Sequence, residues 1–467
     1  MGQCPAMHPR ALLNACTELL RLCLAFEHPA DAVVSRYFRE HRGLGVRERG
    51  ALADAAYAVL RRKLLYEHFA AAGPGEQGER TRQLAVLGLA QVGEALAPGP
   101  AADALPCERL DAALDPDEQR WLAACEAVDP AELPAPCRHN LPEWLAERLR
   151  VQLAEKTGGE VGKESGEPSD KDSGAPFWAL AYSLLRNAPL DLRVNIFKEK
   201  RENVQEELAQ CAIESVATPY SPWGLRLQAK PALASVPAYQ RGAFEVQDEG
   251  SQLLALLLGA KRGEMVADFC AGAGGKTLAI GACMRGTGRL YAFDTSAHRL
   301  EALKERLARS GLANVHTVAI AHERDERIQR LAGKLDRVLV DAPCSGLGTL
   351  RRNPDLKWRQ SAEAVGQFAE RQREILQGAA RLVKPGGRLV YATCSLLTEE
   401  NEAVVAAFSA AHREFDPLDV GAVLAGLKVE RAAELCSGPA SGSDYLRLWP
   451  HRHATDGFFA AGWTRKK

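Results

Sequence analysis

The sequence predicts a multidomain protein, with an all-α N-terminal domain, a small α+β module and a C-terminal α/β domain with a doubly wound sheet. The chain has 467 residues, which is too long for one ordinary domain. Apolar residues recur at helical spacing near the N-terminus, whereas short β-rich runs alternate with helical patterns after about residue 241. A hydrophobic content of 46% and a charged content of 25% are typical of soluble globular proteins.

Residues 1–138 are expected to form the helical domain. Two stretches carry apolar residues three and four positions apart, as one face of a helix requires. The first runs from Leu12 to Cys23, and the second is "ERGALADAAYAVLRRKLLYEHFAA".

Residues 139–240 are expected to form the small α+β module. A helix is predicted in "HNLPEWLAERLRVQLAE", a strand in "LDLRVNIF", a helix from Arg201 to Cys211 and a strand in "GLRLQA". The intervening residues, about 156–175, contain almost no apolar side chains and are rich in Gly, Ser, Lys and Glu. Such a composition buries too little surface to order itself, so we predict a disordered insert there.

Residues 241–467 show the alternation that is typical of a doubly wound sheet. Helical patterns such as "EVQDEGSQLLALLLGA" and "SAHRLEALKERLARSG" separate the apolar runs. The predicted strands are "EMVADFC", "RLYAFD", "NVHTVAI", "DRVLVDAP" and "GRLVYATC".

Several classes of protein are disfavoured. No run of about 18 apolar residues is present, so no membrane span is expected. The N-terminus lacks the layout of a signal peptide, and Ala6 breaks the myristoylation pattern. The 12 cysteines are scattered without a C-x-x-C pair, which argues against a metal site or a disulfide scaffold. This usage suits a reducing cytosol, so a cytoplasmic location is expected.

The charge pattern is ambiguous. A net charge of −1 excludes a strongly basic coat, but local charge decides nucleic-acid binding. Basic residues gather in two stretches, which are either solvated faces or RNA-binding surfaces. The first contains Arg36, Arg39, Arg42, Arg47, Arg49, Arg61, Arg62 and Lys63, and the second contains Arg351, Arg352, Lys357 and Arg359.

The stretch "DFCAGAGGKT" resembles the end of a phosphate-binding P-loop, and "DRVLVDAP" resembles the magnesium-binding strand of an NTPase. A P-loop, however, needs a glycine five positions before the Gly of Gly-Lys-Thr, and that position is Cys270. The alternative is a dinucleotide-type loop, in which Gly272, Gly274 and Gly275 allow close approach of a ligand. Asp294 ends the next strand, where an acid can accept both ribose hydroxyls. The loop fits a nicotinamide enzyme, an S-adenosylmethionine enzyme or a tight turn without a ligand.

Two cysteines favour the S-adenosylmethionine enzyme among these three alternatives. Cys344 in "DAPCSG" and Cys394 in "ATCS" each follow a predicted parallel strand, at the edge where open α/β sheets bind ligands. A thiolate that adds to C6 of a pyrimidine makes C5 nucleophilic enough to accept a sulfonium methyl group. Paired thiols beside a methyl donor therefore suggest pyrimidine C5 methylation.

At these residues the sequence resembles the RNA (cytosine-5) methyltransferase family. The segments "DFCAGAGGKT", "DAPCSGLGTLRRNPDLKW", "YATCSLLTEENE" and "DGFFAA" match its motifs in order, and "PLDLRVN" and "RGAFEVQDEGSQLL" match the preceding segments. The resemblance covers roughly residues 139–467. The helical front resembles a NusB-like RNA-binding domain, a combination similar to the bacterial type that acts on 16S ribosomal RNA.

The resemblance implies roles for individual residues. Cys394 is the implied nucleophile, Cys344 assists release of the product, and Asp341 lies near both the methyl donor and the base. Arg351, Arg352 and Lys357 are expected to grip RNA phosphates. The residues implied to hold S-adenosylmethionine are Cys270, Ala271, Gly272, Ala273, Gly274, Gly275, Lys276, Asp294, Asp325 and Asp341.

Two departures from the family pattern stand out. Ala273 replaces the proline that the family usually has in this loop, which is expected to make the loop more flexible. The family's acid after the third strand is also missing from "VAIAHERDER", so Asp325, His322 and Glu323 compete for that place.

The sequence thus predicts a cytoplasmic enzyme that methylates cytosine C5 in RNA, with 16S ribosomal RNA as the expected substrate. A transfer RNA substrate is an alternative within the class, and a non-catalytic RNA-binding assembly factor is an alternative outside it. The target nucleotide and the oligomeric state stay open.

Overall fold

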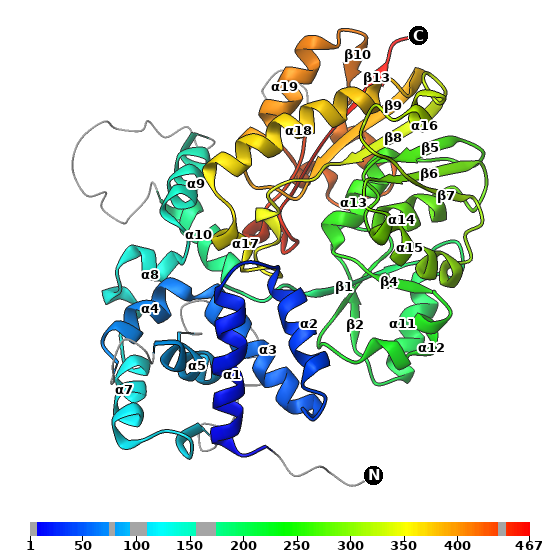
Figure 1. The fold of residues 1–467 in the computed structure, drawn as a ribbon. Helices are drawn as coiled ribbons and strands as arrows, with labels where there is room; N and C mark the ends of the chain where they lie inside the picture. The colour runs from blue at the N-terminus through cyan, green and yellow to red at the C-terminus, as the bar shows by residue number, and fades with distance from the viewer. Residues whose placement is uncertain (1–6, 74–79, 94–109, 156–173, 438–444) are drawn as a thin grey trace. The chain divides into compact units, whose positions relative to one another are not determined.

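The computed structural model describes residues 7–73, 80–93, 110–155, 174–437 and 445–467 (Figure 1). The chain divides into two compact units. The first, called the helical unit, comprises residues 1–187 and 349–362, and the second, called the sheet unit, comprises residues 188–348 and 363–467. The three domain boundaries expected from the sequence stay a prediction. In the described residues, no helix combines the length and the apolar character that crossing a membrane requires.

The helical unit is built around one apolar core. On its first helix, Leu13, Cys16, Leu19 and Leu20 are fully buried, which follows from their spacing of three and four residues. The second predicted helical stretch is interrupted at Arg62 and forms two helices. The predicted insert lies mostly outside the described residues. The helices are α1 (Pro9–Leu24), α2 (Ala30–Glu40), α3 (Val46–Arg61), α4 (Lys63–Ala71), α5 (Arg80–Ala90), α7 (Pro116–Glu126), η3 (Pro130–Glu132), α8 (Ala135–His139), α9 (Glu143–Glu155), α10 (Ala175–Leu184) and α17 (Leu356–Arg359).

Residues 349–362 form an excursion, because they interrupt the sheet unit in the sequence and belong to the helical unit. Lys357 Nζ donates to the carbonyl of Arg61 at 2.7 Å, and Trp358 Nε1 donates to the carbonyl of Leu60 at 2.7 Å. Burial lowers the pKa of Lys357 well below its ordinary value. The expected phosphate grip is therefore wrong for Lys357, which is buried, and Arg351 is only 6% exposed.

The first basic stretch also separates into two groups. Arg36, Arg39, Arg42 and Arg47 are exposed on and after α2. Arg61 and Arg62 are buried, and Arg61 donates to the carbonyl of Arg351 in the excursion at 2.9 Å. The exposed group remains available to a phosphate backbone.

The sheet unit begins with the small module, a four-stranded antiparallel sheet in the order β2-β3-β1-β4. The predicted strands and the predicted helix are present, and two short strands add to them. The elements are β1 (Leu190–Val194), α11 (Arg201–Gln210), β2 (Ser215–Ala217), β3 (Gly224–Leu227), η4 (Leu233–Ser235), α12 (Pro237–Gln240) and β4 (Phe244–Val246).

The large sheet has the order β11-β12-β13-β9-β8-β5-β6-β7, and β10 pairs with β13. All five predicted strands are present, and they run parallel to one another. The antiparallel strands beside β9 were not predicted. The strands are β5 (Met265–Asp268), β6 (Arg289–Asp294), β7 (Val315–Ala319), β8 (Leu335–Asp341), β9 (Val383–Thr393), β10 (Phe415–Pro417), β11 (Cys436–Ser437), β12 (Tyr445–Leu448) and β13 (Phe458–Arg465).

Helices cover both faces of the large sheet, as a doubly wound fold requires (Figure 1). One face packs against α13 (Glu249–Leu258) and α14 (Gly275–Cys283), and the other packs against α18 (Ala362–Ala380) and α19 (Glu402–Ala411). The remaining helices are α15 (Ala297–Ser310), α16 (Glu326–Gln329), η5 (Leu347–Thr349), η6 (Thr398–Glu400), α20 (Val420–Gly426), η7 (Ala432–Leu435) and α21 (Pro450–His453).

Candidate active site

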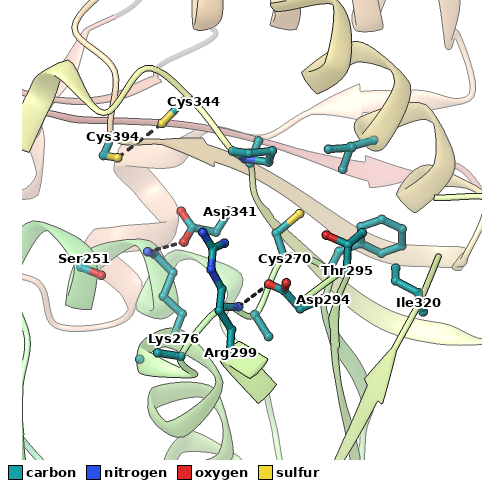
Figure 2. Close-up of a pocket in the computed structure, with 18 of the residues that line it drawn as sticks. Ser251, Cys270, Lys276, Asp294, Thr295, Arg299, Ile320, Asp341, Cys344 and Cys394 are labelled. Atoms are coloured by element: carbon teal, nitrogen blue, oxygen red, sulfur yellow. Dashed lines mark hydrogen bonds and ion pairs between the residues drawn. The ribbon is translucent and has the colours of Figure 1, made fainter. Parts of the chain in front are cut away.

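A pocket of about 490 Å³ opens at the carboxyl ends of the parallel strands (Figure 2). Loops that follow β5, β6, β8 and β9 supply its walls. The central strands therefore bring together side chains that are far apart in the sequence, as the carboxyl edge of an open α/β sheet does for its ligands.

The glycine loop joins β5 to α14 and forms one wall of the pocket. Gly272 has φ +54°, and a Cβ placed there would meet no atom within 4 Å. Gly274 has φ +82°, and a Cβ placed there would fall 2.0 Å from Leu303 Cδ1. The two glycines therefore serve different purposes, since Gly272 leaves space in the pocket and Gly274 permits close packing of α15.

Asp294 at the end of β6 fastens the same loop. Its Oδ2 accepts a hydrogen bond from the backbone N–H of Gly272 at 2.8 Å, and its Oδ1 accepts one from Ser296 at 2.7 Å. The carboxylate lines the pocket, and its remaining lone pairs are positioned to accept hydroxyl groups.

Asp268, at the end of β5, anchors the start of α14 directly after the glycine loop. It is fully buried and accepts a hydrogen bond from Thr277 Oγ1 at 2.7 Å. Burial raises the pKa of Asp268 to about 7. This carboxyl group is accordingly poised between its neutral and charged forms near neutral pH.

Lys276 and Asp341 form an ion pair in the pocket (Figure 2), with Lys276 Nζ 2.7 Å from Asp341 Oδ2. Burial acts to lower the pKa of Lys276, but the charge of Asp341 and its hydrogen bond outweigh this effect and raise the pKa overall. Lys276 is therefore a permanent cation in the pocket.

Cys344 and Cys394 meet at the opposite wall, with their sulfur atoms 3.4 Å apart. Cys344 follows β8, and Cys394 follows β9, so two neighbouring strands deliver the two thiols to one place. A hydrogen bond with Cys394 and burial raise the pKa of Cys344 well above its ordinary value. Cys344 is accordingly held as a neutral thiol.

The charges around the two thiols differ. The charge of Glu400 adds to the rise of the pKa of Cys344, after the hydrogen bond with Cys394 and burial. On the other side, the thiolate of Cys394 is one of the charges that raise the pKa of Lys276. An anion thus lies near Cys344 and a cation near Cys394.

A family model described as 16S rRNA methyltransferase RsmB/F matches residues 255–464, which contain the glycine loop, Asp341 and both pocket cysteines. Residues 255–464 belong to the RsmB/F family. The resemblance drawn from the motifs is confirmed.

Relatives extend the RsmB/F match further along the chain. A probable ribosomal RNA small subunit methyltransferase B from Synechocystis sp. is 33% identical over 327 residues, 69% of this chain and 66% of the relative. A protein with the same name from Bacillus subtilis is 34% identical over 276 residues, 59% of each chain. In both cases the match spans less than two thirds of the relative's length.

Solved structures agree with the fold. The crystal structure of PH0851 covers 100% of both chains with a TM-score of 0.73 and 25% identity. The structure of NSun6 from Pyrococcus horikoshii with SFG covers 70% of this chain and 98% of its own, with a TM-score of 0.57 and 21% identity. The predicted fold class is confirmed, with a helical N-terminal region, a small antiparallel module and a C-terminal mixed-sheet domain of the RsmB/F type.

The structure brings most of the predicted site residues into the pocket, although this does not test their roles. Gly274 packs against Leu303 instead of lining the pocket, and Asp325 is placed elsewhere. The pocket residues among those predicted are Cys270, Ala271, Gly272, Ala273, Gly275, Lys276, Asp294, Asp341, Cys344 and Cys394.

The prediction for Asp325 needs a geometric correction. Its carboxylate accepts from the backbone N–H of Arg327 at the start of α16 and pairs with the guanidinium of Arg327 at 2.8 Å. These hydrogen bonds, with one from the backbone of Ala321, hold the pKa of Asp325 below its ordinary value. Glu323 and Ile320 line the pocket in its place. Of the three residues left open by the sequence, Glu323 is thus the best placed.

Sequence reasoning missed several polar groups of the pocket. Arg306 on α15 donates to the carbonyl of Ala273 at 2.6 Å and so fastens the loop where the family's proline is absent. Arg371 on α18 pairs with Glu323 at 2.9 Å. Both arginines come from helices whose pattern reveals only a buried and an exposed face, so no local signal marked them. Gln247, Ser251, Thr295 and Arg299 also line the pocket.

Proposed function

We propose that this protein methylates C5 of a cytosine in 16S ribosomal RNA, with S-adenosylmethionine as the methyl donor and a covalent bond between Cys394 and C6. The observation that carries the proposal is the pair of thiols 3.4 Å apart in the pocket that the glycine loop and Asp294 line. Cysteines at this spacing place two sulfur atoms against neighbouring atoms of one base.

The pocket residues fit a nucleoside-type methyl donor. Gly272 leaves open space where a side chain would otherwise protrude, and Asp294 offers carboxylate oxygens for ribose hydroxyls. Ile320 and Glu323 lie where β7 ends and supply an apolar and a polar contact for a base. When bound there, S-adenosylmethionine supplies an electrophilic methyl group.

The protein's own residues perform the remaining chemistry. The Cys394 thiolate adds to C6, which breaks the π bond between C5 and C6 and makes C5 nucleophilic. After methylation, a base, for which Asp341 is the candidate, takes the C5 proton. The electron pair of the C5–H bond then restores the C5–C6 double bond, the bond between C6 and sulfur breaks, and Cys394 leaves as a thiolate. Asp341 is proposed to handle a proton or to contact the exocyclic amine of the cytosine, with Lys276 holding its carboxylate in place.

The charges of the pocket support this division of roles. Lys276, whose pKa is raised by Asp341, is a cation within electrostatic reach of Cys394. Cys344, whose pKa is raised by its hydrogen bond with Cys394 and by burial, remains a thiol that assists release. The target cytosine must leave its stack to reach either sulfur.

Removal of each thiol tests the chemistry. Cys394→Ala is expected to abolish methyl transfer and to form no covalent complex with RNA. Cys344→Ala is expected to stall at elimination and to accumulate RNA bound through Cys394. Denaturing electrophoresis of each variant with RNA and S-adenosylmethionine distinguishes them. A band from Cys394→Ala alone would exchange the two roles, and active variants without any band would exclude covalent catalysis.

The substrate class needs its own test. Labelled S-adenosylmethionine is supplied with purified 16S ribosomal RNA, with small ribosomal subunits and with bulk transfer RNA. Label in 16S ribosomal RNA, free or assembled, supports the proposal. Label in transfer RNA alone would reassign the substrate, and no label in any RNA would favour a non-catalytic assembly factor.

A further inference from the structure

The two cysteine loops are joined by one buried carboxylate. Glu400 ends the short helix η6, six residues beyond Cys394, and its side chain is 0% exposed. It does not line the pocket. Its position behind the thiols gives it no access to substrate, so any influence on the reaction acts through the loops that it touches.

Glu400 receives hydrogen bonds from both loops. Its Oε1 accepts from the backbone N–H of Ser345 at 2.8 Å, and its Oε2 accepts from Ser345 Oγ at 2.5 Å. Ser395 Oγ also donates to Oε2. Ser345 directly follows Cys344, and Ser395 directly follows Cys394. One side chain thus holds the residue after each cysteine.

A fourth hydrogen bond fixes the carboxylate to the sheet unit. Gln372 Nε2 on α18 donates to Glu400 Oε1 at 3.0 Å. Tyr391 on β9 donates to the backbone carbonyl of Glu400 at 2.6 Å and lies 3.0 Å from Gln372 Oε1. The four donors to the carboxylate are uncharged, so its negative charge is solvated by hydrogen bonds and not cancelled by a cation.

We propose that Glu400 is a positioning residue, which sets the separation and direction of the Cys344 and Cys394 thiols by clamping the serine after each of them. This inference rests on the proposed function for its kinetic part only. Such a clamp matters because the two sulfur atoms must serve adjacent carbon atoms of one base, and a displacement of about 1 Å costs on the order of 100-fold in rate.

Two substitutions separate the clamp from the charge. Glu400→Ala removes all four hydrogen bonds. Glu400→Gln keeps an oxygen for Ser345 N–H and Gln372, and its amide can donate to the two serine hydroxyls, which accept as readily as they donate. Of the hydrogen bonds to Glu400, Ser395→Ala removes only the one from the Cys394 loop. It is the milder variant, to be used if Glu400→Ala does not fold. The matched control is Glu370→Gln, the same change at an exposed position of α18.

A thiol-bridging reagent measures the geometry without RNA or methyl donor. Dibromobimane links two thiols that lie within a few ångströms, and peptide mass spectrometry of the full-length protein locates the Cys344–Cys394 bridge. Bridging is expected to fall about tenfold or more in Glu400→Ala and less in Ser395→Ala. Glu400→Gln and Glu370→Gln are expected to stay within about threefold of the wild type.

Kinetics supply the second readout. Glu400→Ala is expected to lower kcat on the order of 100-fold with KM for RNA and for S-adenosylmethionine within about threefold, because Glu400 lies outside the pocket. Glu400→Gln is expected to restore most of kcat. Unchanged bridging in folded Glu400→Ala, or equal loss of bridging in Glu400→Ala and Glu400→Gln, would overturn the clamp.

Failure of the proposed function leaves a different signature. If the wild type transfers no methyl group to RNA while the bridging series follows the expected order, the clamp stands and the assignment of the reaction falls. If methyl transfer is normal in folded Glu400→Ala, the reaction stands and the clamp falls.

Discussion

Asp294 connects the glycine loop to β6, because its carboxylate accepts a hydrogen bond from the backbone N–H of Gly272. Asp294→Ala is expected to weaken S-adenosylmethionine binding by about 1.5–3 kcal/mol, because charge-assisted hydrogen bonds to ribose and the support of the loop are both lost. This corresponds to roughly tenfold or more in Kd. Calorimetric titration measures it, and Asp294→Asn, which keeps an acceptor, is expected to lose less. Unchanged affinity in both variants would remove Asp294 from the cofactor site.

Asp268 gives stability a pH dependence that is opposite to the common one for carboxylates. Burial raises its pKa to about 7 in the fold, above the ordinary value of 3.8. Between these values the folded protein binds a proton that the unfolded chain has released. Its contribution to stability is therefore full at low pH and is lost as the pH rises through about 7.

Asp268→Asn tests this sign, because the amide stays neutral and can still accept the hydrogen bond from Thr277. Denaturant unfolding of both proteins between about pH 5 and pH 8 is the measurement. The variant is expected to gain stability relative to the wild type as the pH rises. A difference that is constant across this range would show that Asp268 does not titrate there.

At the scale of the elements, the β5–α14 turn contains a matched pair of glycines. Gly274→Ala is expected to destabilise the fold by at least about 2 kcal/mol, because it adds left-handed strain and a close contact with Leu303. Gly272→Ala adds the strain alone, about 1 kcal/mol, but its methyl group enters the pocket. In urea unfolding, Gly274→Ala should therefore lose more stability than Gly272→Ala. In calorimetry, Gly272→Ala should lose more affinity for the cofactor. The same order in both measurements would contradict this division.

Sequence reasoning located the five parallel strands because each is a short apolar run followed by a helical pattern. The antiparallel strands escaped it for physical reasons. The segment "DGFFAA" matches a family motif, yet its strand β13 is defined by pairing with β9, which lies about 70 residues earlier in the chain. Strand pairing over such distances leaves little trace in local periodicity.

The candidate site likewise contains residues that could be predicted from the sequence and residues that could not. Cysteines at strand ends and a glycine loop after a strand were predictable, since their positions follow from the sheet edge. Glu400 lies in the motif "YATCSLLTEENE", but nothing in its local sequence distinguishes a buried carboxylate from an exposed one. The mistaken role for Lys357 has the same origin, since a basic run in the sequence does not reveal which side chains a fold buries.

At the scale of the whole molecule, the helical unit is expected to position RNA through the exposed arginines of α2. Arg36→Ala with Arg39→Ala is expected to reduce the slope of log affinity against log salt by about 1–2, because each RNA phosphate that loses its arginine keeps its counterion on binding. Filter binding to 16S ribosomal RNA at several salt concentrations measures it. Arg413→Ala with Lys428→Ala, on the exposed surface of the sheet unit, is the control. An equal change in both pairs would remove any special role from the helical unit.

The excursion has a consequence for the order in which the protein is made. A ribosome releases residues 1–187 long before residues 349–362, which complete the same compact unit. At about 5–20 residues per second, roughly 10–30 seconds separate the two events. During that interval the carbonyls of Leu60 and Arg61 lack the hydrogen bonds that Trp358 and Lys357 later donate to them. The N-terminal part of this chain is therefore synthesised well before the residues that complete its compact unit.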